Sequence, residues 1–118
     1  MTQEDKELLL TDLCARLPYH PKGVKLYMSF DPEDITIIGY TGRFVETHND
    51  EIPVEKVRLY LRPMSSMTEE EREILRTLKW TKLEHHTVDW LNSHYFDYRD
   101  LIIKGLALEA PKEMYEIQ

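Results

Sequence analysis

The hydrophobic residues of the N-terminal segment recur about every four positions, which is the spacing of an α-helix. The apolar stripe consists of Leu9, Leu10, Leu13, Cys14 and Leu17. Such a spacing gathers these side chains on one face of a helix, which we expect over residues 4–16. Pro18 ends this helix, because proline disfavours a helical conformation at the residue before it.

The spacing of apolar residues then changes from four to two, which predicts β-strands. Four strands are expected, over residues 24–30, 35–40, 43–47 and 54–61. The first alternates apolar and polar residues, and the second is β-branched. Thr41 and Gly42 can close a tight hairpin between the second strand and the third.

The fourth expected strand places Val57, Leu59 and Leu61 on one face, and Pro63 ends it. Short polar connections join the consecutive strands, and such connections favour an antiparallel meander. The pattern fits an open sheet and a small, partly closed barrel equally well.

Helical periodicity returns after residue 67. Thr68 and Glu71 match a capping box, in which each side chain accepts a hydrogen bond from the backbone N–H of the other residue. Ile74, Leu75 and Leu78 are expected to form the buried stripe of this helix.

A second helix is expected over residues 83–95. Three residues share one of its faces, namely Val88, Leu91 and Tyr95. The apolar residues 101–108 should pack back as a short turn or an extended piece, and residues 111–118 should be loosely held. The sequence therefore predicts one α+β domain over residues 1–118, with an N-terminal helix, a four-stranded antiparallel meander and two C-terminal helices.

Charge and cysteine content restrict the functional classes. The chain carries 15 basic and 22 acidic residues, for a formal charge of −7, which disfavours non-specific binding of nucleic acid. A local basic patch, or an acidic surface that mimics DNA, stays open as an alternative. Cys14 is the single cysteine, so no intrachain disulfide can form. No apolar run has the length of a secretory leader or a membrane span, so we expect a cytoplasmic protein without membrane contact.

Histidines on the second predicted helix are the first candidates for chemistry. His85, His86, Asp89 and His94 have spacings that a metal site could use. The His-Glu-x-x-His motif of catalytic zinc helices is absent, and adjacent histidines on a polar helix are more often a solvated surface. An enzyme with an unrecognised His/Asp site over residues 83–95 is therefore the alternative, and no metal or other cofactor is expected.

The aromatic residues at the end of that helix are the stronger candidates. Trp90, Phe96, Tyr98 and Arg99 are of the types enriched at protein interfaces, and we name them the candidate interaction patch. The competing interpretation is that they anchor the last helix onto the sheet, since aromatic residues dominate cores.

Several segments of the chain carry a family resemblance. They read LCARLPY followed by GVK, then YLRPMSSMTEE, DWLNSHYFDYR and KGLALEAP. Together they resemble a group of small proteins encoded by phages and mobile elements of gut anaerobes of the Bacteroides type. The departure lies at His20-Pro21-Lys22, which lengthens the first loop. No activity is established for that group, so the resemblance implies an origin and a shared fold and transfers no catalytic residue.

These observations favour a non-enzymatic protein-binding module, an accessory factor of a phage or mobile element. The partner is expected to be a protein that the sequence does not identify, and a homo-oligomer stays open. Small size, the lack of catalytic motifs and the family setting motivate this expectation.

The capping box makes the first testable prediction. Replacing Thr68 with alanine removes the acceptor for the backbone N–H of residue 71 and should lower the free energy of unfolding by about 1 kcal/mol. Urea denaturation of the wild type and of Thr68→Ala measures this difference. An unchanged midpoint would show that the capping box does not form.

Overall fold

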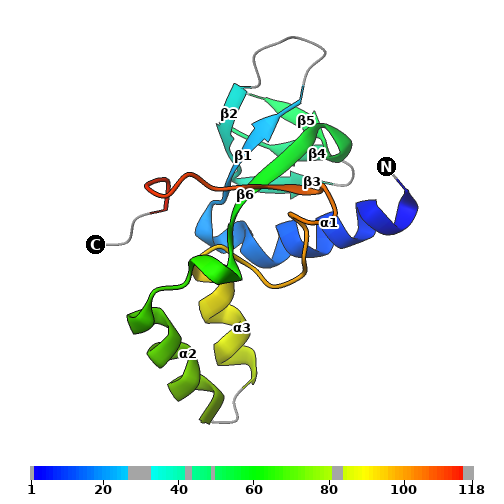
Figure 1. Cartoon of the computed structure of the whole chain (residues 1–118). Helices are drawn as coiled ribbons and strands as arrows, with labels where there is room; N and C mark the ends of the chain where they lie inside the picture. Colours follow the sequence, from blue (N-terminus) through cyan, green and yellow to red (C-terminus); the bar gives the residue numbers. More distant parts are fainter. Residues whose placement is uncertain (1, 27–32, 42–43, 49, 81–83, 116–118) are drawn as a thin grey trace.

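The computed structural model describes residues 2–26, 33–41, 44–48, 50–80 and 84–115. Its elements form a β body that one helix crosses, together with a pair of helices that extends away from that body (Figure 1). The expected α+β class, the N-terminal helix and the two later helices are all present.

Helix α1 (Gln3–Arg16) lies against the β body. It begins at a capping box in which Asp5 N–H donates to the Thr2 hydroxyl over 3.0 Å and Thr2 N–H donates to the Asp5 carboxylate. Leu9 and Leu13 are buried, as expected. Cys14 is exposed, so its expected place on the buried stripe is wrong. The buried face instead includes the charged residues Asp12 and Arg16, which a hydrophobic pattern does not reveal.

The larger sheet has β6 (Val57–Pro63) at its centre. Along β6 the residues Val57, Leu59 and Leu61 are buried and alternate with half-buried ones, as the sequence predicted. On one side, β6 pairs antiparallel with β1 (Lys22–Lys25), which in turn pairs antiparallel with β2 (Glu33–Thr36). On the other side, β6 pairs in parallel with two short strands. These strands are β7 (Phe96–Asp97) and β8 (Ala107–Glu109).

A second, smaller sheet is an antiparallel meander. It consists of β3 (Gly39–Thr41), β4 (Phe44–Glu46) and β5 (Glu51–Pro53), paired in chain order. The chain passes between the sheets at Ile37 and Ile38. The N–H of Ile37 donates to Pro21 O at the larger sheet, and the N–H of Ile38 donates to Glu46 O at the smaller one.

The expected four-stranded antiparallel meander is therefore wrong in detail. The strand predicted over residues 35–40 is divided between β2 and β3, because successive backbone N–H groups bond to different sheets. The strand predicted over residues 54–61 begins as a 3₁₀ turn at Val54–Lys56. Two parallel neighbours of β6 come from the C-terminal part of the chain. Of the strand predicted over residues 24–30, residues 27–30 lie outside the described residues, as does Gly42 of the predicted hairpin.

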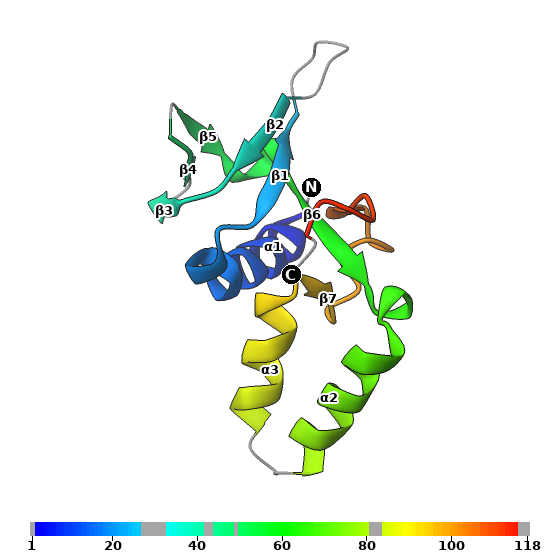
Figure 2. The same ribbon diagram turned by 90° about the vertical axis from the view of Figure 1, so that its left-hand side faces the viewer.

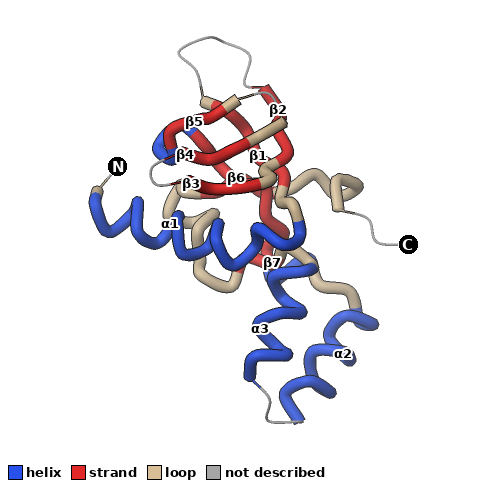
Figure 3. The backbone as a smooth tube through the Cα atoms, turned by 180° about the vertical axis from the view of Figure 1, so that it is seen from behind, coloured by secondary structure: helices blue, strands red, loops and turns tan. Residues whose placement is uncertain are grey.

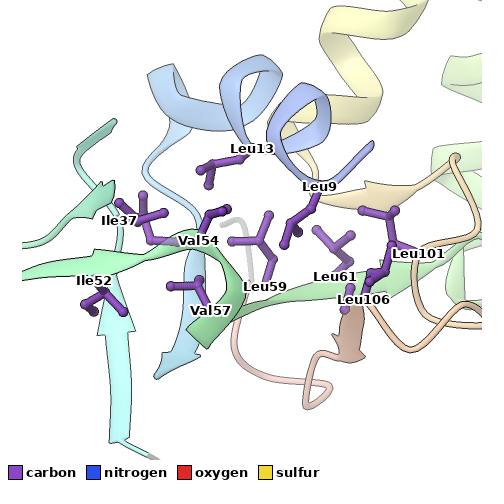
Figure 4. Packing of buried hydrophobic residues seen from close by; sticks show 12 residues of the cluster. Leu9, Leu13, Ile37, Ile52, Val54, Val57, Leu59, Leu61, Leu101 and Leu106 are labelled. Carbon is purple, nitrogen blue, oxygen red and sulfur yellow. The ribbon is translucent and has the colours of Figure 1, made fainter. Parts of the chain in front are cut away.

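The main core lies between the two sheets and α1. Figure 4 shows side chains from both sheets and from α1 pointing toward one another. The buried cluster contains Leu9, Leu13, Ile37, Val45, Ile52, Val54, Val57, Leu59, Leu61, Leu101, Leu106 and Ala107. Three of these residues, Leu101, Leu106 and Ala107, confirm that the apolar segment over residues 101–108 packs back onto the body, where it forms turns and β8.

The C-terminal segment is held by a tyrosine. The Tyr115 hydroxyl accepts a hydrogen bond from Lys22 N–H over 2.8 Å and lies 2.9 Å from Tyr60 O, to which it donates. Its ring stacks on Tyr95 with the centroids 3.7 Å apart. The expected loose end is thus wrong at Tyr115, which is buried, and residues 116–118 lie outside the described residues.

Helices α2 (Glu69–Trp80) and α3 (Glu84–Ser93) stand side by side and extend away from the sheets (Figures 2 and 3). A second apolar cluster of buried Met67, Leu91 and Phe96 lies at their base. The capping box is confirmed, because Glu71 N–H donates to the Thr68 hydroxyl and Thr68 N–H donates to the Glu71 carboxylate.

A buried group of charges connects α1 to the end of this helix pair. Arg16 makes two hydrogen bonds of 2.9 Å to the carboxylate of Asp12, and both side chains are fully buried. Arg16 also donates to Phe96 O over 2.6 Å. Arg99 donates to Asp12 over 2.7 Å, so one carboxylate faces two guanidinium groups. Such a network is stable only while its charges remain paired.

Removing Asp12 should therefore be strongly destabilising. In Asp12→Ala the Arg16 charge stays buried without its partner, and we expect a loss of about 3–5 kcal/mol in the free energy of unfolding. The double variant Asp12→Leu, Arg16→Met should lose less than Asp12→Leu alone, because it leaves no buried charge at these two positions. Urea denaturation measures the free energy of unfolding of each variant. A double variant that is less stable than Asp12→Leu would contradict this account.

Candidate functional site

The α2–α3 pair, which we call the hairpin, leaves apolar side chains in contact with solvent. None of the described residues of α2 is buried, although its sequence is strongly amphipathic. Ile74 is 45% exposed, and Trp80 at the end of α2 is 82% exposed. The expected buried stripe of Ile74, Leu75 and Leu78 is therefore wrong. Periodicity places apolar residues on one face, and here a single neighbouring helix covers that face only in part.

The base of the hairpin is held by an ion pair. Arg62 on β6 donates two hydrogen bonds of 2.7 and 2.8 Å to the carboxylate of Glu71, which also closes the capping box with Thr68. The Arg62 hydrogen bonds lower the pKa of Glu71 to about 2, against a partial desolvation that acts in the opposite direction. The Arg62 guanidinium lies 4.2 Å from the centre of the Phe96 ring. These contacts connect the entry of α2 to the larger sheet.

An open groove lies beside this anchor, between the hairpin base and the C-terminal segment. It is lined by Arg62, Pro63, Ser66, Thr68, Glu70, Glu71, His94, Glu109, Ala110, Pro111, Lys112 and Tyr115. The lining comes from three separate stretches of the chain and combines apolar residues with both signs of charge. Burial raises the pKa of Tyr115, so its hydroxyl is a neutral donor and acceptor here.

The charges of the groove are only partly compensated. Arg62 and Glu71 neutralise each other. Among the described residues, neither Glu70 nor Glu109 has an ion-pair partner, and the same is true of Lys112. Counting only pairs between described residues, the groove therefore presents two unpaired carboxylates and one unpaired ammonium group.

His94 lines the groove in a fixed orientation. Its Nδ1 lies 2.9 Å from Trp90 O, and because a carbonyl only accepts, Nδ1 is assigned the hydrogen. In the neutral ring, Nε2 is then the acceptor. The ring also stacks on Trp90 with the centroids 4.4 Å apart. His94 is thus held as a planar, partly polar wall of the groove.

The four residues of the candidate interaction patch do not gather on one exposed surface. Phe96 is fully buried, and Trp90 is half-buried against the cluster at the hairpin base. The Tyr98 hydroxyl donates to the Asn92 side chain over 2.7 Å, and Arg99 pairs with Asp12. These positions fit the competing interpretation, in which the residues anchor the last helix to the body.

The other residues singled out from the sequence are dispersed. On α3, His85, His86 and Asp89 are exposed, whereas His94 follows the helix and lines the groove. Within the described ranges, no group of three or more His, Cys, Asp or Glu side chains is placed to hold a metal ion. Tyr95 does not share the predicted helix face, because α3 ends at Ser93 and Tyr95 has a φ of 61°.

Sequence reasoning did not find the groove. Arg62 and Glu70 are near each other in the sequence, but Glu109 reaches them only through the parallel pairing of β6 with β8. The one local signal was the capping box, which places Glu71 on the first turn of α2 but does not reveal Arg62 as its partner.

No family model, curated protein or solved structure matches the chain when it is compared with known proteins. Function is therefore inferred from its own residues. Within the residues that the structure describes, no helix has the length and apolar character needed to cross a membrane.

Neutralising Glu71 tests the anchor of the hairpin. The pKa of Glu71 is lowered from 4.5 to about 2 in the folded protein, so its contribution to stability is complete above pH 4.5 and is lost as the pH falls toward 2. Glu71→Gln can keep the capping box but removes the charge. It should lower the free energy of unfolding by roughly 2 kcal/mol at pH 7.

Urea denaturation at several pH values should show the two proteins converging below pH 4.5. The matched control is Glu69→Gln, which removes a charge from the same helical turn at an exposed pair with Arg72 and should change stability little. A Glu71→Gln defect that is the same at pH 3 and pH 7 would contradict the ion-pair account.

Proposed function

We propose that this chain is a non-enzymatic protein-binding module that engages its partner through the hairpin. The observation that carries the proposal is the amphipathic helix α2, none of whose described residues is buried. Two large apolar side chains on it, Ile74 and Trp80, are well exposed. Tryptophan is among the residues that contribute most to protein interfaces when a partner covers it.

The way in which the hairpin is attached supports this role. Its base is fixed by the Arg62–Glu71 ion pair and by the buried cluster around Phe96. Its far end extends away from the β body, where a partner can approach it from several sides (Figure 2). A rigid base with an apolar, accessible end reduces the entropy lost on binding.

The alternatives have less support. An enzymatic site on α3 rests on the histidines, of which only His94 lines the groove. Binding of nucleic acid requires clustered free cations. On α2, Arg72 pairs with Glu69 and Arg76 pairs with Glu73, which leaves mixed charge along the helix.

The proposal includes an origin and a location. The resemblance of the segments around Thr68 and His94 to proteins of phages and mobile elements supports an accessory role in such an element. The single cysteine, Cys14, leaves the chain without an internal disulfide and supports a cytoplasmic location.

Quantitative affinity capture tests the proposal. The wild type, Ile74→Ser and Trp80→Ser are used to capture proteins from a host lysate, and a specific partner should be lost with both variants. The matched control is Ile103→Ser, which replaces a side chain that is 87% exposed in the turn before β8. With the purified partner, Trp80→Ser should weaken binding about 30-fold, the effect of a 2 kcal/mol hot spot.

All three variants replace exposed side chains, so their thermal melts should match the wild type. The proposal requires a captured protein that is lost with Ile74→Ser and with Trp80→Ser but is retained with Ile103→Ser. If the capture yields no such protein, the proposal is overturned.

A further inference from the structure

The groove and the hairpin form one continuous surface. Glu70 on α2 and His94 after α3 both line the groove. Ile74 lies one helical turn beyond Glu70, and Trp90 lies one turn before His94 with its ring stacked on the histidine. Side chains four residues apart share a helix face. The lining of the groove therefore continues along the hairpin as Ile74 on α2 and Trp90 on α3.

We propose that this surface, the groove side of the hairpin, binds a basic amphipathic α-helix of the partner. This inference rests on the proposed function, and it states the chemistry of the segment that the partner contributes. The bound helix lies along α2 and α3 as a third helix, with an apolar stripe against Ile74 and Trp90 and with lysine or arginine residues against the carboxylates of the groove.

The packing of the hairpin indicates a helix as the occupant. Two antiparallel helices can cover each other along one side only, and here Leu75 and Leu78 remain half-buried while Ile74 is 45% exposed. Adding a third helix is the regular way to cover such a seam, by ridges that pack into the groove between two helices. α2 has 12 residues, so it offers a seam of about 18 Å, which matches a helix of three turns.

The charges of the groove indicate a basic occupant. Glu70 and Glu109 lack ion-pair partners among the described residues, while Arg62 is already engaged by Glu71. Lys112 is the one lining cation for which the described part of the chain supplies no ion-pair partner. The formal charge of the whole chain, −7, also favours the approach of a positively charged segment.

Selection from a displayed library of random 16-residue peptides tests the occupant directly, with the full-length chain as the target. Enriched peptides should combine apolar residues at the spacing i, i+3, i+4 and i+7 with lysine or arginine, and should gain helical circular dichroism on binding. Synthetic peptides from the selection then serve as the probes, and fluorescence anisotropy measures their affinity.

Two pairs of variants locate the site. Ile74→Glu should weaken peptide binding by at least tenfold. Its control, Val88→Glu, lies on another side of α3, six residues before His94, and should not weaken it. Glu70→Lys should weaken binding by at least fivefold, whereas Glu69→Lys, on the neighbouring residue outside the groove, should not.

Several results would overturn the inference. One is that the selection enriches acidic, proline-rich or extended peptides. Another is that each variant and its control bind the selected peptides equally well. A third is that the wild-type target enriches no peptides beyond those that the Ile74→Glu target enriches. Self-association of the chain that Ile74→Glu abolishes would also overturn it, since a second copy would then be the occupant. If the selection fails while the capture experiment still yields a partner that requires Trp80, only the helical, basic occupant is wrong and the proposed function stands.

Discussion

The fully buried pair of Asp12 and Arg16 is the interaction on which the arrangement of this protein depends. Moving two charges out of water is costly, and the cost is offset only by close geometry and further hydrogen bonds. Here a bidentate pair, Arg99 and the Phe96 carbonyl supply them. One guanidinium nitrogen, Arg16 Nη1, is buried and has no hydrogen-bond partner among the described residues. The acceptors of the network therefore do not satisfy every N–H donor of the buried guanidinium. α1, β7 and the turn that carries Arg99 are thereby fixed relative to one another.

The hairpin is fixed at both of its connections to the β body. Where the chain enters α2, Arg62 holds Glu71 beside the larger sheet. Where it leaves α3, Arg16 holds the carbonyl of Phe96. These polar contacts are directional, so they determine the angle of the hairpin as well as its attachment. The apolar surface farther along the helices is therefore presented in a defined orientation, although little of it is covered by the rest of the chain.

The parts of the fold that follow from local signals could be predicted from the sequence. The capping box at Thr68 and the alternation along β6 are examples, because each depends on residues a few positions apart. β7 and β8 could not be predicted, since strands of two and three residues carry no periodic signal and are defined by their pairing with β6. Asp12 was missed because its burial depends on Arg16 and Arg99. Ile74 shows the reverse case: the periodicity correctly places it on the apolar face of the helix, but none of the described residues covers it fully.

The parallel pairing of β8 with β6 has a consequence for how the chain folds. Leu106 and Ala107 belong to the main core, and Tyr115 bonds to Lys22 across 93 residues of sequence. A growing polypeptide that has not yet reached these positions leaves Leu59–Leu61 of β6 without their β8 partners and part of the core open to water. Contacts between residues so far apart in the sequence form slowly, because closing the long loop between them costs conformational entropy. The β body is consequently completed only after the residues up to Tyr115 have left the ribosome, whereas α1 and the hairpin can form from local contacts beforehand.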